Sequence, residues 1–218
     1  MIRKLWMIPV VAGLILVMPS AAMAWKPAGG AVDLVYWLGE MDFSGETDDM
    51  EGFGVEADVW ITPRLGASLD YYPTNGGGVF NQLDTNYVAL DLKWKLLNAE
   101  EKGFLSAGLG WQATALTVPG DRISTKGFRL VLEGEATIAG PVRGYMRYAH
   151  LPDLDDLAPQ VTGGDGVEYA LGLKLDVRYF EIVAGYRVHD FGFDFTGIGP
   201  AAIDIDNAGM IAGISWQF

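Results

Sequence analysis

Histidines close to carboxylates are the residues of this sequence that could support acid–base chemistry. The chain contains two histidines, His150 and His189, and an acid follows each of them, Asp153 and Asp190. An imidazole that is oriented by a carboxylate can act as a general base near neutral pH. A surface hydrolase that uses these two histidines is therefore one alternative. We expect both histidines at the outer ends of strands. The simpler interpretation is that they are ordinary residues of that rim, and we assign no catalytic residue.

Clusters of aspartate are a second place where chemistry is conceivable. Two short clusters occur, one at Asp153, Asp155 and Asp156 and one at Asp204 and Asp206. Carboxylate oxygens are the ligands that Ca²⁺ and Mg²⁺ prefer, but neither cluster has the spacing of an EF-hand loop. We keep these five residues as candidate metal ligands, with divalent cations as candidate partners. The alternative is that they form a solvated acidic surface.

Composition excludes several other kinds of site. No phosphate-binding loop, dinucleotide-binding fingerprint, zinc motif or nucleophile elbow occurs after residue 24, so we predict no cofactor. The formal net charge of −13, from 28 acidic and 15 basic residues, argues against a nucleic-acid-binding surface. The chain has no cysteine, so disulfides are not available to stabilise it.

Charged residues elsewhere alternate with apolar ones along short segments. Strands place alternate side chains on opposite faces, so this pattern predicts strands. We expect ten of them, at residues 32–42, 53–61, 65–72, 86–96, 104–117, 127–138, 142–148, 167–178, 181–189 and 207–218. In each of the last nine, one face is apolar and the other carries small residues, polar groups and charges. In the first strand we place Leu34, Tyr36 and Leu38 outward, but its alternation is the poorest of the set and leaves the facing open.

This alternation places nine acids and eight bases on the polar face. Isolated charges are costly in a confined space of low dielectric, whereas paired ones are tolerable. We therefore predict an internal ion-pair network, and the alternative is a small hydrated pore whose wall carries both signs. The predicted members are Glu56, Asp58, Asp70, Asp91, Lys93, Lys95, Arg129, Glu133, Glu135, Arg143, Arg147, Glu168, Lys174, Asp176, Arg178, Glu181 and Arg187.

The connections between the predicted strands alternate in length. Short turns follow the second, fourth, sixth and eighth strands, and long loops follow the odd-numbered ones. The long loops contain only two bases, Arg122 and Lys126, so we expect nearly all the net negative charge at one end of the molecule. The loop acids are Glu46, Asp48, Asp49, Glu51, Asp84, Asp121, Asp153, Asp155, Asp156, Asp165, Asp190, Asp194, Asp204 and Asp206.

The amino terminus has the layout of a secretory signal peptide. Arg3 and Lys4 precede an apolar run from Leu5 to Met18, and a small-residue site follows at Ala22-Met23-Ala24. A membrane anchor would need about 20 apolar residues, and this run is shorter and contains Pro9. We predict that residues 1–24 are removed and that residues 25–218 form one domain.

These features favour an all-β fold, a transmembrane antiparallel up-and-down β-barrel. Bacterial membrane barrels have an even number of strands, short turns at one end, long loops at the other and an apolar outer face. Ten strands fit best, with eight as the alternative. A soluble lipocalin-like barrel would show the same alternation. However, the glycines share a face with the charges, which suits a narrow interior, while the large apolar residues suit lipid.

The last predicted strand carries a more specific signal. In NAGMIAGISWQF, Met210, Ile214, Trp216 and Phe218 lie on one face. This segment resembles the closing strand of bacterial outer-membrane β-barrels, whose terminal phenylalanine is part of the signal read by the assembly machinery. The resemblance implies that Trp216 and Phe218 serve as an assembly signal. It also implies outer-membrane lipid, lipopolysaccharide and the barrel assembly machinery as partners.

Over its whole mature length the chain resembles small barrels of the OmpA-domain, OmpX and OmpW kind, with no motif for a subfamily. The resemblance implies a non-enzymatic protein of a Gram-negative outer membrane, either structural or a narrow passive channel with an acidic extracellular mouth. A loop-mediated adhesin is a further alternative. Omptin proteases also have ten strands, but His189-Asp190 is not the omptin Asp-x-His arrangement. The oligomeric state is left open.

Overall fold

The computed structural model describes residues 27–43, 46–76, 84–99, 102–118, 121–156, 161–195 and 201–218. The predicted signal peptide lies outside these residues. Almost all of the described chain is in strands, as the alternation of apolar and polar residues predicts. No helix among the described residues is long and apolar enough to cross a membrane.

Ten strands follow one another along the chain, and sequence neighbours pair in antiparallel orientation. The strands are β1 (Gly29–Phe43), β2 (Glu46–Trp60), β3 (Leu65–Gly76), β4 (Asp84–Asn98), β5 (Gly103–Val118), β6 (Asp121–Ala139), β7 (Val142–Leu154), β8 (Val161–Val177), β9 (Phe180–Phe195) and β10 (Ala201–Gln217).

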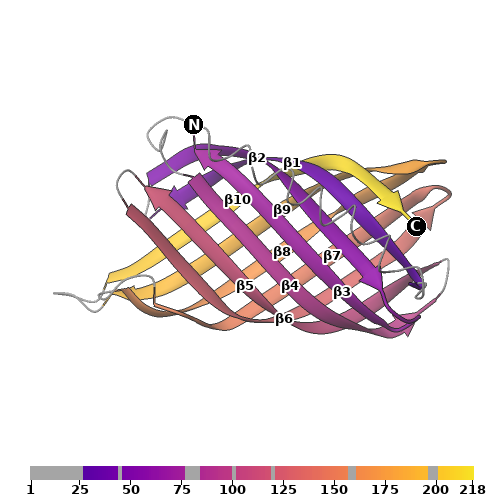
Figure 1. Cartoon of the computed structure of the whole chain (residues 1–218). Coiled ribbons are helices and arrows are strands. Elements are labelled where there is room, and N and C mark those ends of the chain that lie inside the picture. The colour runs from indigo at the N-terminus through magenta and orange to yellow at the C-terminus, as the bar shows by residue number, and fades with distance from the viewer. Residues whose placement is uncertain are drawn as a thin grey trace, which may run out of the picture.

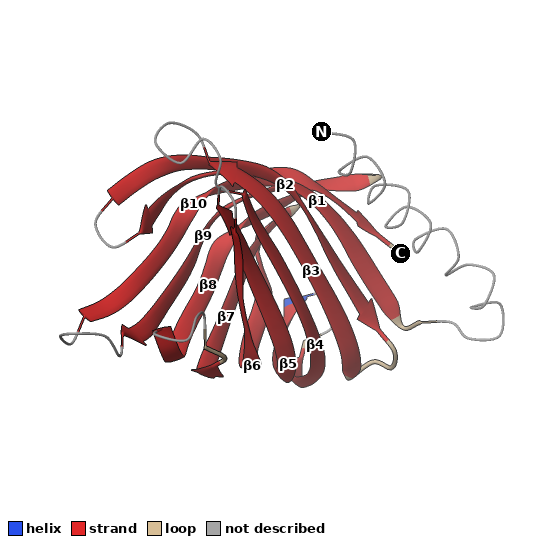
Figure 2. Cartoon of the chain, turned by 60° about the vertical axis from the view of Figure 1, so that its left-hand side comes forward, coloured by secondary structure: helices blue, strands red, loops and turns tan. Residues whose placement is uncertain are grey.

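The sheet closes into a barrel because β1 also pairs with β10. This pairing runs from Ala31 opposite Gln217 to Phe43 opposite Ile205, so the closing seam extends along most of both strands. The strands cross the wall of the barrel on a slant (Figure 1), and a second view shows how they curve around the interior (Figure 2). The ten-stranded antiparallel barrel is confirmed, and the eight-stranded alternative is wrong.

The two faces of the wall differ as the alternation predicts. On β8, the side chains of Leu171 and Leu173 are 56% and 50% exposed on the outside, whereas Glu168 and Ala170 are buried inside. The facing of β1, left open by the sequence, is now defined: Leu34 and Leu38 lie outside, and Val35 and Trp37 lie inside. An apolar outer face and a polar interior are the pattern of a barrel in lipid.

The strands are longer than predicted. A tilted strand of about 9–11 residues crosses a bilayer, but β6 has 19 residues and β8 has 17. Extra length lies at the end where residues 44–45, 77–83, 119–120, 155–160 and 196–200 connect the strands. We call this the loop end. The opposite, turn end has the connections 61–64, 99–102, 140–141 and 178–179.

The predicted long loops are therefore largely wrong. Residues 190–206, expected as the longest loop, instead continue β9 to Phe195 and begin β10 at Ala201. Of the acids assigned to long loops, all except Asp155 and Asp156 belong to strands. The reason is that the polarity of the two faces inverts toward the loop end. There Phe191 and Phe193 point inward and are buried, while exposed acids such as Asp190 and Asp194 point outward.

Glycines on the inner face make room for large rings. A Cβ at Gly54 would overlap the ring of Tyr72, and a Cβ at Gly209 would overlap the indole Nε1 of Trp37. Both rings are nearly fully buried. Glycine at these two positions thus lets an aromatic side chain lie flat on the backbone of a neighbouring strand.

The outward facing of Leu173 gives the first prediction. We expect Leu173→Arg to destabilise the folded barrel in lipid bilayers by about 2–4 kcal/mol, because it places a charge near the middle of the apolar band. Val177→Arg, at the turn end of the same face of β8, is the matched control and should cost about 0–1 kcal/mol. Urea titration of both variants in vesicles measures the difference. Equal stability of Leu173→Arg and the unsubstituted chain would contradict the assignment of the faces.

Candidate functional site

Charged side chains meet across the interior of the barrel. Arg147 of β7 lies at the centre of this cluster. Its Nη1 lies 2.6 Å from Oδ2 of Asp70 and 3.6 Å from Oε2 of Glu56, and its Nη2 lies 3.4 Å from Oε2 of Glu133. A second contact from Nη2 reaches Asp58 at 3.7 Å. One guanidinium therefore joins β7 to β2, β3 and β6.

Arg129 of β6 organises a second group of contacts. Its Nε lies 3.2 Å from Oδ1 of Asp91, and its Nη1 lies 3.4 Å from Oε2 of Glu168. Nη1 also donates hydrogen bonds to Oε1 of Gln112, at 3.2 Å, and to the hydroxyl of Tyr87. Arg129 and Glu168 are both fully buried. The contacts connect β6 to β4, β5 and β8 across the interior.

Arg187 and Lys93 complete the central part of the cluster. Nη2 of Arg187 donates to Oε1 of Glu56 at 2.8 Å, and the Arg187 guanidinium lies 4.4 Å from the ring centroid of Tyr72. Nζ of Lys93 donates to Oε2 of Glu133 at 2.8 Å and also to Asp58. Because Glu56, Asp58 and Glu133 each contact two of these cations, Arg147, Arg187 and Lys93 form one connected group, beside the separate group around Arg129. We call the two groups together the ion-pair network.

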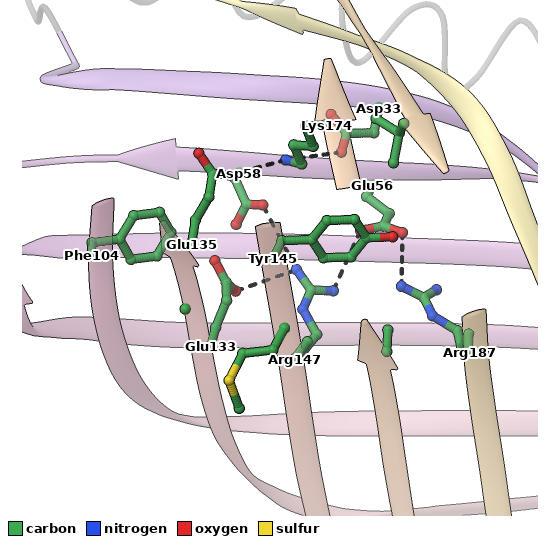
Figure 3. Close-up of a pocket in the computed structure, with 14 residues that line it drawn as sticks. Asp33, Glu56, Asp58, Phe104, Glu133, Glu135, Tyr145, Arg147, Lys174 and Arg187 are labelled. Carbon is green, nitrogen blue, oxygen red and sulfur yellow. Dashed lines mark hydrogen bonds and ion pairs between the residues drawn. The ribbon is translucent and has the colours of Figure 1, made fainter. Parts of the chain in front are cut away.

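A smaller set of ion pairs lies toward the turn end. Nζ of Lys174 lies 3.6 Å from Oδ2 of Asp33 and 3.5 Å from Oε2 of Glu135, and Arg143 pairs with Glu135 and Glu181. A cavity of about 450 Å³, which includes its opening to solvent, lies among these groups. Its charged lining residues are Asp33, Glu56, Asp58, Glu133, Glu135, Arg147, Lys174 and Arg187. Figure 3 shows Tyr145 and Arg147 pointing into this cavity between the acids.

Burial explains why the charges must be paired. Lys93, Arg129 and Arg187 are at most 1% exposed. Removing such groups from water costs several kcal/mol each, and only close partners with good geometry offset this. Each of these cations has at least one carboxylate within 3.2 Å, so the network offsets part of this cost. Its side chains come from opposite walls, so the same contacts that neutralise the charges also span the interior.

The structure brings most of the predicted network members together, with three exceptions. Lys95 lies over the ring of Trp60, with Nζ 4.0 Å from the centroid, instead of in the central cluster. Asp176 and Arg178 are exposed at the turn end, and Arg178 has a positive φ of 56° in the turn. Both residues fit the alternation of polar and apolar types, but at the end of β8 their side chains lie outside the closed interior.

Several members of the network were missed by the sequence reasoning. Asp33 belongs to β1, whose alternation is poor, so its inward position had no clear signal. Tyr72, Tyr87 and Gln112 contribute hydrogen bonds to the charged groups. The alternation also places these three residues on the inner face, but the predicted network includes charged residues only.

Comparison with solved structures places this geometry in context. The outer membrane protease OmpT from Escherichia coli aligns with 90% of this chain and 99% of its own, at 10% sequence identity and a TM-score of 0.54. The chain has the fold of small bacterial outer-membrane β-barrel proteins. Neisserial surface protein A and OprG from Pseudomonas aeruginosa, both at 11% identity, cover 87% and 89% of this chain and 97% and 98% of theirs, with TM-scores of 0.48 and 0.37.

No protein-family model matches the chain. No curated protein matches it in sequence. At 10% identity the likeness to OmpT establishes a shared fold and carries no information on activity.

The two histidines of this barrel do not form one site. His189 points inward, is buried, and has its Nε2 3.6 Å from Oε1 of Glu168. His150 lies on the outward face of β7, in line with Met146 and Tyr148. The expected position of both histidines at strand ends is also wrong, because β7 continues to Leu154 and β9 to Phe195. The barrel wall separates the two imidazoles.

The candidate metal ligands are likewise spread out. Asp155 lies 3.5 Å from Nζ of Lys126, and Oδ1 of Asp156 accepts a hydrogen bond of 2.8 Å from the backbone N–H of Gly163. Asp153, Asp204 and Asp206 are exposed on strands. Among the residues that the structure describes, no group of three or more histidines and carboxylates is arranged to hold a metal ion.

The central position of Arg147 gives the second prediction. We expect Arg147→Met to destabilise the barrel by about 3–5 kcal/mol, because it leaves Asp70 buried without its cation and leaves Glu133 with Lys93 alone. Lys126→Met is the matched control, since it breaks an ion pair whose side chains are 59% and 60% exposed, and it should cost less than about 1 kcal/mol. Urea titration in detergent micelles reports both values. A loss as small for Arg147→Met as for Lys126→Met would show that the network does not hold the barrel together.

Proposed function

We propose that this chain is a non-enzymatic integral protein of the bacterial outer membrane whose barrel is closed to ions, so that its role is structural. The observation that carries the proposal is the ion-pair network, whose two groups surround Arg147 and Arg129. Its side chains come from β2, β3, β4, β6, β7, β8 and β9 and meet across the interior. A permeating ion would have to displace paired groups that are held in a poorly hydrated space.

The orientation follows from the connections and the charges. In bacterial barrels short turns face the periplasm and longer connections face outward, so the turn end is periplasmic and the loop end is extracellular. Residues 1–24 act as the export signal. Trp216 and Phe218 are exposed on the outer surface of the turn end, where the assembly machinery and lipid can contact them. Lipopolysaccharide then surrounds the acid-rich outer surface of the loop end.

A narrow passive channel is the second candidate. It is favoured by the charged cavity of about 450 Å³ at the turn end and by the exposed acids of the loop end, which would select cations. In this case the central network would have to rearrange to let ions pass.

Two further alternatives have less support. A hydrolase based on His150 and His189 would need both imidazoles at one substrate, but they lie on opposite faces of the wall. An adhesin would use the loop-end surface, and none of the contacts there favours one protein partner over another.

Single-channel recording in planar bilayers tests the proposal. We expect the folded barrel to be silent. The variant Arg129→Ser/Glu168→Ser/Arg147→Ser/Asp70→Ser removes two cations and two anions from the network, so the interior stays near neutral but loses its closure. We expect this variant to conduct in steady steps.

The matched control is Lys126→Ser/Asp155→Ser, which removes an exposed ion pair at the loop end and should remain silent. Steady, cation-preferring steps from the unsubstituted barrel would overturn the closed structural role in favour of the channel.

A further inference from the structure

The extracellular half of the interior contains a second cavity, of very different character. Its volume is about 570 Å³ when its opening to solvent is counted. We call it the loop-end cavity. Its lining has no lysine, arginine, aspartate or glutamate. The lining residues are Trp37, Met41, Tyr72, Thr74, Thr85, Tyr87, Thr114, Leu116, Thr125, His189, Phe191, Phe193, Ile205 and Asn207.

Aromatic rings form the floor of this cavity and separate it from the ion-pair network. The ring of His189 stacks on that of Tyr87, with centroids 4.6 Å apart, and lies edge-on to Trp37 at 5.0 Å. Tyr72 contacts both Trp37 and Tyr87. The hydroxyls of Tyr72 and Tyr87 donate to Glu56 and Glu168 of the network. The polar ends of the two tyrosines are thus already used on the network side.

The side walls are apolar where the strands extend beyond the expected membrane thickness. Met41 and Leu116 belong to one buried apolar cluster, and Phe191 and Phe193 belong to another. Ile205 packs against both clusters. An apolar space with an aromatic floor favours a flat ring or a short hydrocarbon as its occupant.

Four polar atoms of the lining are buried and make no hydrogen bond to any other described residue: Trp37 Nε1, Thr114 Oγ1, His189 Nε2 and Asn207 Oδ1. Nε2 of His189 lies 3.6 Å from Oε1 of Glu168, on the network side, so the other three atoms give the site its chemical preference. Trp37 and Asn207 are more than nine-tenths buried and come from the paired strands β1 and β10, where Asn207 lies opposite Met41. Buried polar groups normally have partners, and leaving them unpaired costs free energy. The other lining threonines are bonded within the protein.

We propose that the loop-end cavity binds a neutral, single-ring aromatic alcohol, that is, a compound of the phenol class. The ring packs between the aromatic floor and the apolar walls. The hydroxyl group accepts a hydrogen bond from the indole N–H of Trp37 and donates one to Oδ1 of Asn207. A hydroxyl is the smallest group that satisfies a donor and an acceptor at once.

Charge excludes the related acids and bases. A carboxylate would enter a cavity that offers no cation, past a surface rich in exposed acids such as Asp190, Asp204 and Asp206. An ammonium would lose its hydration without gaining a carboxylate, because Glu168 is already paired with Arg129. Both losses are large compared with one hydrogen bond.

Calorimetric titration of the folded barrel in detergent micelles with p-cresol, toluene and benzoate tests the proposal, with protein-free micelles as the blank. We expect saturable binding of p-cresol at one site per barrel. Toluene, which lacks the hydroxyl, should bind roughly threefold to tenfold more weakly. Benzoate should show no binding above the blank.

Substitutions in the lining locate the site. Trp37→Phe and Asn207→Leu should each weaken p-cresol binding roughly threefold to tenfold and leave toluene binding unchanged. Thr114→Trp should abolish binding of both by filling the cavity. Trp111→Phe, which changes a tryptophan on the lipid-facing surface, is the matched control and should change neither affinity.

Two outcomes would overturn the inference. Absence of saturable p-cresol binding to the unsubstituted, folded barrel would mean that the cavity is only the apolar core of the extended strands. Equal affinities for p-cresol and toluene, unaffected by Trp37→Phe and Asn207→Leu, would mean that the site does not recognise the hydroxyl. Both tests remain decisive if Thr114→Trp fails to fold, and neither depends on whether the barrel conducts ions.

Discussion

Backbone hydrogen bonding without water is the constraint on which this structure depends. In hydrocarbon every N–H and C=O needs a partner within the protein, and a sheet meets this need only by closing on itself. The seam between β1 and β10 provides that closure. Once the sheet is closed, alternate side chains must enter a narrow interior. The buried arginines of that interior follow from the closure, because the outward half of each strand is reserved for apolar residues.

The sequence predicts this fold well because, in a closed barrel, apolar outward side chains alternate with polar inward ones along each strand. The sequence alone shows, for example, that Leu171 and Leu173 lie on the opposite face of their strand from Glu168 and Lys174. The alternation gives the strand number and the inner charges, but not which charges pair. The contact of Arg147 with Asp70 depends on the stagger of β3 and β7 around the barrel, and a single sequence contains no measure of that stagger.

The errors arise where the solvent outside the barrel changes. Near the loop end, water replaces lipid, so acids such as Asp190 occupy the outer face and Phe191 and Phe193 occupy the inner one. These segments are rich in glycine and aspartate, a composition that is typical of loops, although in the structure they continue the strands. The same reading placed His189 at a rim, whereas its neighbours Tyr87 and Glu168 enclose it. The loop-end cavity was not predicted either, because its walls are formed by these extended strand segments.

The sharing of carboxylates within the network has a consequence for how such a protein can evolve. Glu56 and Glu133 each serve more than one cation, so the effect of replacing one inner residue depends on which others are present. Acceptable changes inside the barrel must then occur in compensating sets, whereas any residue of the lipid-facing surface can drift alone among apolar types. In two descendants of one ancestral barrel, the residues of the outer surface would therefore change one at a time, whereas the inner residues would change in groups.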